Sequence, residues 1–448
     1  MHKTPRYFIS IFIVIGQLVS SKGYCENVNG RFTFGGYTAT ERFTDSSGTG
    51  SDKNDFQTLS ARFFLNVEKI SKSDWQTTVD LRDKHDFFDK LDAERLQLSS
   101  KNEFQVRQLS VKNSETERFW GVQLGRFAVL EAGAAFTDGL QVENHWNREW
   151  TSSLFAGLNP KRDDQSYTAY NSEAEIRGGT LTYQRSTKSW NENFYSTQAL
   201  VEKATHGEAN RRYFFNNLNY QWSQNSRVIT LLYYDFLTRS FIQNGNLIWQ
   251  QGWSDYFQTE ANAFVIDAIE YDRRKNVLEA LPASPYREGS LKFNLNLGKT
   301  SGRIHLRAQS GEREVDQKKR TAVEIGFIKT GLFGPQWDIY GTLGAQKNFV
   351  SEDQIARFGL GYFSRKWEWS LDAQSQIQKN DNGTTSRPII LESSLANYVS
   401  RNTYLTLAGQ YAKDERVTIL GAFFRVGYRF GSREIPPLRD GAPPRGPL

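Results

Sequence analysis

The chain has 448 residues, of which 14% are aromatic, whereas all hydrophobic residues together make up only 38%. Soluble domains this rich in large rings would also carry many aliphatic residues to fill their cores, so a set of ordinary soluble domains is disfavoured. The single cysteine excludes an intrachain disulfide framework and a cysteine-based zinc site.

Residues 1–23 have the order of a secretory signal peptide. Lys3 and Arg6 precede an apolar run over 8–19, and small and polar residues follow as far as Gly23. The run is shorter than the roughly 20 apolar residues that a membrane-spanning helix needs. We therefore expect export, with cleavage after Gly23.

A lipid anchor on Cys25 is the alternative for this terminus, and the bulky Tyr24 before the cysteine disfavours it. Removal of residues 1–23 takes away three cations and no acid, which lowers the formal net charge from +6 to +3. So small a charge on so long a chain gives no case for nucleic-acid binding.

Period-two alternation then continues almost to the end of the chain. In 366–378 the odd positions are mainly apolar and the even positions are polar or charged, and similar alternation recurs at 75–82, 291–297, 303–309 and 417–430. Because successive side chains of a strand point to opposite faces, each segment has one apolar and one polar side. Segments of about ten such residues separated by turns are typical of a transmembrane antiparallel β-barrel.

We count 22 such segments, which is an even number, as in single-chain bacterial barrels. We expect an all-β barrel of 16 to 22 strands. The alternation is poorest in 127–160 and 241–287. The expected strands are 29–43, 56–69, 74–84, 104–113, 118–127, 138–147, 149–158, 174–184, 190–201, 210–222, 226–237, 241–251, 262–272, 288–297, 301–309, 320–330, 336–346, 354–363, 366–378, 388–398, 402–411 and 416–430.

Soluble sandwiches, propellers and β-helices also alternate, but three features favour a membrane barrel. The expected connections are short at 223–226 and 364–366 and long at 85–102 and 159–172, as in outer-membrane barrels with short periplasmic turns and longer extracellular loops. Aromatic residues collect near the expected strand ends. No fixed repeat of 20–50 residues suggests a solenoid or propeller.

The last expected strand indicates which face meets lipid. Phe424, Val426, Tyr428 and Phe430 should point outward, because the opposite register would drive Arg425 into hydrocarbon. An Arg near the membrane midplane costs about 2–4 kcal/mol. The barrel should therefore occupy 24–430 with the arginines of this strand in the lumen.

The run 421–430 resembles the C-terminal assembly signal of outer-membrane proteins, which ends on an aromatic residue. That resemblance implies recognition by the barrel-assembly machinery through the C-terminal strand. The run departs from the pattern because residues follow Phe430: five of the eleven prolines lie in 431–448. We expect this segment to be an unfolded periplasmic tail.

Barrels of 16–18 strands leave an aqueous channel, whereas transporters of 22 strands carry a plug. The first alternating segment starts about five residues after the expected cleavage site, so no plug domain is expected before it. The small, apolar loop 128–136 has two alternatives, an inward constriction and a short helix at the rim.

Segments 104–112, 119–127 and 139–143 carry a family resemblance. They resemble the alginate-export and related substrate-specific porin families, in which an Arg-containing strand precedes a Leu-x-Leu-Gly-Arg-Gln type strand. The match covers about 60 residues, and Phe127 stands where the family usually has Gln. The resemblance implies a diffusion channel and names no substrate.

Charged side chains on the expected lumen face are the candidates for solute selection. Rings of Arg or Lys select anions and rings of carboxylates select cations, so a mild anion preference is one hypothesis. The other is that these are ordinary wetted residues with cross-strand partners. The candidates are Arg82, Lys292, Arg303, His305, Arg307, Lys366, Glu368, Asp372, Arg425 and Arg429.

No catalytic, metal or cofactor site is expected. The acidic stretch 80–92 lacks the spacing and glycine of a calcium loop and suits a solvated extracellular loop. No Gly-x-Ser-x-Gly motif occurs, and no His has a diagnostic neighbour. We expect a bacterial outer-membrane porin that lets small hydrophilic solutes diffuse passively, with lipid around it and a homo-oligomer left open. The alternative is a non-conducting surface barrel whose extracellular loops bind a partner.

Overall fold

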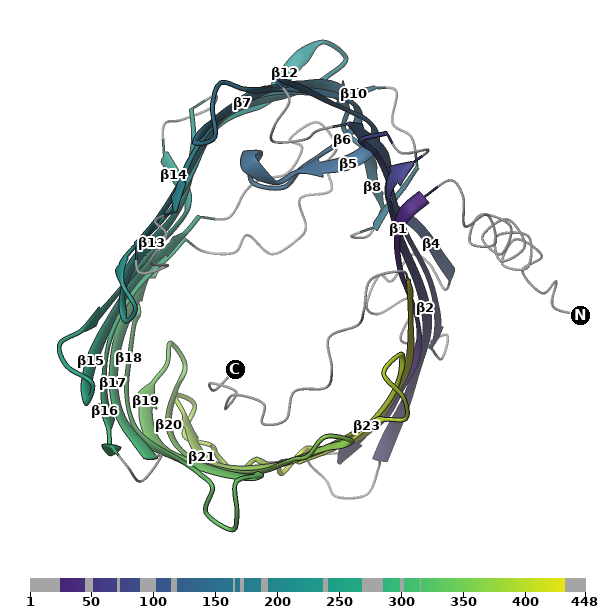
Figure 1. Cartoon of the computed structure of the whole chain (residues 1–448). Coiled ribbons are helices and arrows are strands. Elements are labelled where there is room, and N and C mark those ends of the chain that lie inside the picture. The colour runs from purple at the N-terminus through teal and green to yellow at the C-terminus, as the bar shows by residue number, and fades with distance from the viewer. Residues whose placement is uncertain are drawn as a thin grey trace, which may run out of the picture.

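The computed structural model is an antiparallel β-barrel that closes on itself (Figure 1). β1 (Cys25–Thr44) pairs with β25 (Val417–Gly431) from Asn29 opposite Gly431 to Phe43 opposite Val417. The structure describes residues 25–44, 51–70, 73–88, 102–113, 119–163, 166–169, 173–186, 192–236, 241–267, 285–298, 302–314 and 316–431.

The described part of the main sheet has 23 strands. One of them, β22 (Thr385–Ser386), is a two-residue strand that shares its neighbour β21 with β23, so 22 strands form the wall. This confirms the all-β barrel at the upper end of the expected range. β8 (Lys161–Asp163) and β9 (Ser166–Ala169) form a separate two-stranded sheet.

The remaining wall strands are β2 (Ser51–Ile70), β3 (Trp75–Phe88), β4 (Asn102–Asn113), β5 (Trp120–Val129), β6 (Ala135–His145), β7 (Trp150–Leu158), β10 (Ala174–Ser186), β11 (Asn193–Thr205), β12 (Glu208–Ser223), β13 (Ser226–Asp235), β14 (Phe241–Gly252), β15 (Phe257–Ile266), β16 (Tyr286–Asn296), β17 (Gly302–Arg313), β18 (Lys319–Thr330), β19 (Trp337–Lys347), β20 (Ser351–Phe363), β21 (Trp367–Asn380), β23 (Ile389–Tyr398) and β24 (Thr403–Lys413).

Each expected strand overlaps one wall strand, and the largest displacement is at β15, which was expected at 262–272. The backbone N–H groups of Tyr256 and Phe257 donate to Ser254 Oγ at 3.2 and 3.1 Å. This side-chain-to-backbone turn starts the strand at Phe257. The alternation of apolar and polar residues does not predict this turn.

The expected loop 85–102 is wrong at its beginning, because β3 continues to Phe88. Asp86 lies on the inner face, where its carboxylate accepts hydrogen bonds from Thr58 Oγ1 at 2.6 Å and Lys84 Nζ at 2.5 Å. These contacts keep a polar segment in the sheet. The acidic stretch is thus partly strand, and its last residues, 89–92, lie outside the described residues.

The expected signal peptide 1–23 and residues 432–448 of the expected tail also lie outside the described residues, while Gly431 is the last residue of β25. Among the described residues, no helix is long and apolar enough to cross a membrane.

Connections differ in length between the two ends of the barrel. At the end where β1 begins and β25 ends, called here the terminal end, none spans more than six residues. The longest connections, 89–101, 159–173 and 267–285, all lie at the opposite end. Short turns on one side and long loops on the other are the arrangement of outer-membrane barrels.

Glycine is required where β6 and β7 face each other at Gly139 and Gly157. A Cβ added to Gly139 would lie 2.1 Å from the carbonyl oxygen of Ala156, and that oxygen belongs to backbone that cannot rotate away. A Cβ added to Gly289 on β16 would lie 3.9 Å from its nearest neighbour, the carbonyl oxygen of Asn262.

We predict that Gly139→Ala destabilises the barrel by about 1–3 kcal/mol, the usual cost of overpacking, whereas Gly289→Ala leaves it unchanged. The measurement is the urea dependence of folding in detergent micelles, followed by heat-modifiable gel mobility. Equal midpoints for the two variants would contradict the close packing of β6 against β7.

Candidate functional site in the barrel lumen

The lumen is wider than side chains can fill. For 22 strands about 4.8 Å apart and tilted by about 40°, the circumference implies a backbone diameter of roughly 40 Å. Side chains reach inward by much less than half of that distance. The wall by itself therefore encloses an unfilled space, unlike the packed interior of an eight-stranded barrel.

One hairpin tip, residues 127–137, leaves the wall and enters this space; we call it the inward hairpin (Figure 1). β5 pairs with β4 only as far as Leu109 opposite Arg126. On the other side, β6 pairs with β7 only from Asp138 onward. The strands between these positions pair only with each other, and the 3-10 turn η1 (Leu130–Ala132) lies at the tip.

Arg126 fixes the point of departure. Its Nε and Nη2 donate to the two carboxylate oxygens of Asp138, each at 2.6 Å. Its Nη1 donates to the carbonyl of Val106 at 3.1 Å, on the part of β4 that β5 no longer pairs. Gly125 beside it has φ +108, and a Cβ there would lie 2.2 Å from the Leu109 carbonyl oxygen. Gly125 thus permits the bend of the strand, and Arg126 satisfies one carbonyl of the exposed edge.

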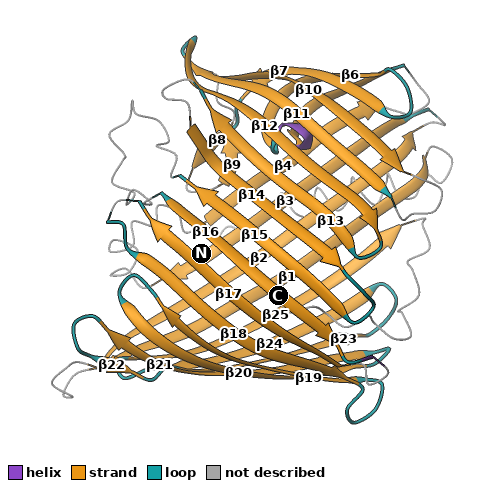
Figure 2. Ribbon diagram, turned by 90° about the vertical axis from the view of Figure 1, so that its left-hand side faces the viewer, coloured by secondary structure: helices purple, strands orange, loops and turns teal. Residues whose placement is uncertain are grey.

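The inward hairpin packs on the inner wall. Phe127 and Val129 are fully buried against a cluster that includes Ile176, Val201 and Phe215 from β10, β11 and β12. Figure 2 shows η1 beside β11 and β12. The outward neighbours of this wall, such as Leu200, are exposed, which identifies the two faces of the sheet.

Two tyrosine hydroxyls hold the tip. Tyr213 Oη donates to the Ala132 carbonyl at 3.1 Å and Tyr233 Oη donates to the Gly133 carbonyl at 2.9 Å. Gly133 is left-handed, and a Cβ on it would lie 2.4 Å from the Tyr233 hydroxyl. Both alternatives for loop 128–136 are therefore partly right: it folds inward, and it contains a short helical turn.

Several inward acids are paired with inward cations, as expected for a polar lumen wall. Directly opposed residues of neighbouring strands share a face, so the register shows which residues of each strand point inward. Ion pairs on this face are Arg62–Asp80 at 2.6 Å, Lys84–Asp86 at 2.5 Å, Lys112–Glu143 at 2.9 Å, Arg211–Asp235 at 3.2 Å, Arg320–Glu288 at 3.4 Å and Arg357–Asp372 at 3.2 Å, and His305 Nε2 lies 3.1 Å from Glu324 Oε1.

The predicted ladder Arg303, His305 and Arg307 lies on the inner face of β17, and acids on neighbouring strands offset part of its charge. His305 is only 4% exposed, packs over Gly326 and contacts Glu324, so it is not a wetted pore residue. Lys292 lies opposite Arg307, and the same row contains Glu260 and Glu324 at its two ends.

The other candidates lie apart from this ladder. Glu368 lies on β21 and accepts a hydrogen bond from the hydroxyl of Tyr398 on β23 at 3.0 Å. Lys366 is not on a strand as predicted: it lies in the turn between β20 and β21, because Ser364 and Trp367 pair to close that turn. It is therefore at the terminal-end rim rather than on the lumen wall.

Arginines gather on the inner face at the closure of the barrel, formed by β25, β1, β2 and β3; we call this surface the seam wall. Arg31 lies directly opposite Arg429, and Arg62 directly opposite Arg82. Arg425 contributes to the same wall, with its guanidinium 5.0 Å from the Phe423 ring. Like charges directly opposite each other are destabilising unless water or anions screen them.

Sequence reasoning missed Arg31, Arg62 and the role of Arg126. Arg31 and Arg62 occupy polar positions of alternating segments, so their direction was readable. Their pairing with other arginines depends on strand register, which alternation does not reveal.

No group of three or more His, Cys, Asp or Glu side chains within the described ranges is arranged to hold a metal ion.

Comparisons with known proteins identify no family. No protein-family model matches, so the resemblance to the alginate-export and related porins stays a prediction, and no curated protein matches. Among solved structures, OccAB4 of Acinetobacter baumannii has 7% identity and a TM-score of 0.46, covering 91% of this chain and 99% of that chain. OccK5 (OpdH) of Pseudomonas aeruginosa has 8% identity and a TM-score of 0.45, covering 92% and 100%.

The translocation pore of the P pilus usher PapC has 9% identity and a TM-score of 0.42, covering 89% of this chain and 99% of that chain. At such identities and scores these likenesses carry no functional weight. The barrel assignment rests on the strand pairing of this chain.

Removal of both tip hydrogen bonds, in Tyr213→Phe with Tyr233→Phe, should loosen the inward hairpin. Each neutral hydrogen bond contributes about 1 kcal/mol, so amide exchange in 127–137 should accelerate by about tenfold or more. Hydrogen–deuterium exchange in detergent measures this, with outward-facing Tyr411→Phe as the control. Unchanged exchange would mean that apolar packing alone holds the hairpin.

Proposed function

We propose that the chain is an outer-membrane channel for passive diffusion of small hydrophilic solutes. The observation that carries the proposal is a closed wall of 22 strands whose lumen is too wide for its polar side chains to fill. The outward face supports a membrane location, since it exposes large apolar side chains such as Leu154 at 72% and Leu343 at 63%.

The lengths of the connections support an orientation. With short turns in the periplasm and long loops outside the cell, the terminal end is periplasmic. The aromatic Phe430 lies next to the last residue of β25 at that end, where the barrel-assembly machinery would recognise it.

The inward hairpin narrows the lumen from one side. Its docking against β10–β13 places it across part of the solute path, and the exposed side chain of Leu130 lies at its tip. At eleven residues it is far smaller than the plug domain of a 22-stranded transporter. A solute would pass between this hairpin and the charged wall, without a chemical step.

A mild preference for anions is the finer proposal, and it rests on the seam wall. Arg31 and Arg429 concentrate positive charge near the terminal end, and Arg82 adds to it farther along the wall. Cationic linings of this kind favour anions. The β16–β17 wall adds Lys292, Arg303 and Arg307, and Glu260 and Glu324 offset two of these three charges.

The refolded full chain should give stable ohmic current steps in a planar lipid bilayer. The current is expected because water and ions would fill the open lumen. Repeated insertion of folded protein without conductance would contradict the channel and favour the non-conducting surface barrel instead.

Under a KCl gradient, the reversal potential should show weak anion selectivity. Arg31→Gln with Arg429→Gln should shift it toward cations, because two lumen charges are lost. Arg177→Gln, on the outer face, is the control and should leave it unchanged. A wild-type reversal potential on the cation side would contradict the anion preference and leave the channel intact.

A further inference from the structure

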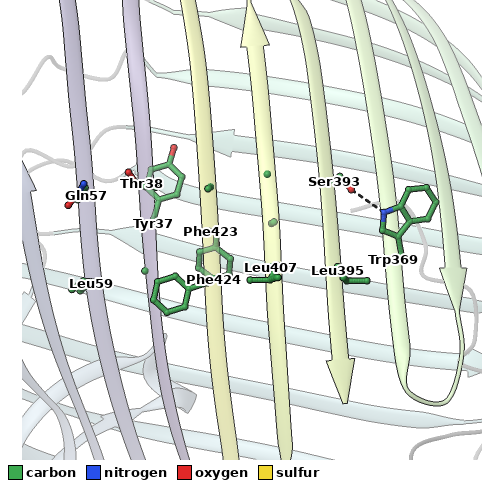
Figure 3. Close-up of a pocket in the computed structure, with 14 residues that line it drawn as sticks. Tyr37, Thr38, Gln57, Leu59, Trp369, Ser393, Leu395, Leu407, Phe423 and Phe424 are labelled. Carbon is green, nitrogen blue, oxygen red and sulfur yellow. Dashed lines mark hydrogen bonds between the residues drawn. The ribbon is translucent and has the colours of Figure 1, made fainter. Parts of the chain in front are cut away.

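A groove of about 690 Å³ lies on the outer surface of the barrel, across the seam between β1 and β25 (Figure 3). Large apolar residues form one side of it, aligned by direct cross-strand pairing. This row consists of Trp369, Leu395, Leu407, Phe424 and Leu59, with Gly36 between the last two.

The floor of the groove is the next outward row, two residues farther along each strand. Its side chains are mostly small: Ser393, Gly409, Ala422 and Thr38 lie directly opposite one another in that order. The row beyond is large again on β23 to β25, with Leu420 62% exposed, and polar on β1 and β2, where Thr40 lies opposite Asp55. Across β21 to β2 the groove runs for about 24 Å, at about 4.8 Å per strand.

A concave apolar surface in a membrane does not stay empty, since lining atoms without partners lose their dispersion contacts. The possible occupants are a lipid chain and a second copy of this protein. The charges beside the groove decide between them.

A row of outward cations lies four residues from the groove floor, toward the end with the long loops. Lys413, Arg42 and Lys53 occupy it, with Thr418 between the first two. At about 3.3 Å per residue, the cations lie about 13 Å along the strands from the floor. Asp55 pairs with Lys53 at 2.7 Å, while Arg42 and Lys413 form no ion pair with any other described residue.

We propose that the groove and the cationic row together bind one anionic, phosphate-bearing lipid, with an acyl chain in the groove and the phosphate at Arg42 and Lys413. This inference rests on the membrane location in the proposed function and not on conductance. The separation of apolar and cationic parts matches that of a lipid chain and its headgroup.

A second copy fits this surface poorly. Copies related by a two-fold axis along the membrane normal would present the same rows at the same depth. Cations would then meet cations, and groove would meet groove, leaving a void between them. Like-charge juxtaposition at an interface is costly, so the charges favour the lipid.

Gly409 offers a way to fill the groove without disturbing the fold. A Cβ there would have one neighbour within 4 Å, the Gly421 carbonyl oxygen at 4.0 Å. Gly36 is unsuitable, because a Cβ there would lie 2.5 Å from the Phe424 ring. Gly289, also outward and open but on β16, provides the matched control.

The test is native mass spectrometry of the full chain in detergent, titrated with phosphatidylglycerol or with phosphatidylcholine of identical acyl chains. Wild-type protein should bind its first phosphatidylglycerol at least about fivefold more tightly than phosphatidylcholine. Gly409→Leu should weaken binding of both lipids, and Gly289→Leu should weaken neither.

The combined change Arg42→Gln, Lys53→Gln and Lys413→Gln should abolish the preference for phosphatidylglycerol. Arg177→Gln with Arg212→Gln removes outward cations that already share Glu202, and should preserve the preference. Equal binding of both lipids by the wild type, or equal effects of the two leucine variants, overturns the proposal.

A wild-type dimer that Gly409→Leu dissociates would assign the groove to a second copy and also overturn the lipid proposal. Failure here is distinguishable from failure of the proposed function. Gly409→Leu should conduct like the wild type in a planar bilayer, so a conducting barrel without lipid preference refutes only this inference.

Discussion

Closure of the hydrogen-bonded wall is the constraint on which the rest of this structure depends. In lipid, backbone N–H and C=O groups have no water to bind, so every strand needs a partner on both sides. The pairing of β1 with β25 removes the last two edges. The opening of the wall beside β4 shows the same constraint, since Arg126 supplies a donor to the Val106 carbonyl where β5 has left.

Closure at 22 strands also determines what the interior can be. A ring this wide cannot pack its own side chains across the middle, so the inward face must be compatible with water. Ion pairs such as Arg62–Asp80 meet that requirement over much of the wall. The inward hairpin is the exception: it brings Phe127 and Val129 to an apolar patch and gives the lumen a local packed core.

The two faces of the seam have different chemistry because strand alternation separates them. Inside, Arg31 and Arg429 oppose each other in the lumen. Outside, the same strands carry the apolar groove and, nearer the long loops, Arg42. A shift of one residue in register would exchange these faces, so the pairing of β1 with β25 fixes the inner and the outer surface together.

The sequence by itself determined the fold class, the approximate position of each strand and which residues alternate, because period two is a local property of the chain. It also indicated the direction of Arg425 and Arg429. Tertiary structure alone decided the partners: that Arg31 meets Arg429, that Glu324 covers His305, and that loop 128–136 folds inward. The physical reason is that register and inward packing join residues far apart in the chain, through hydrogen bonds and contacts that no local pattern specifies.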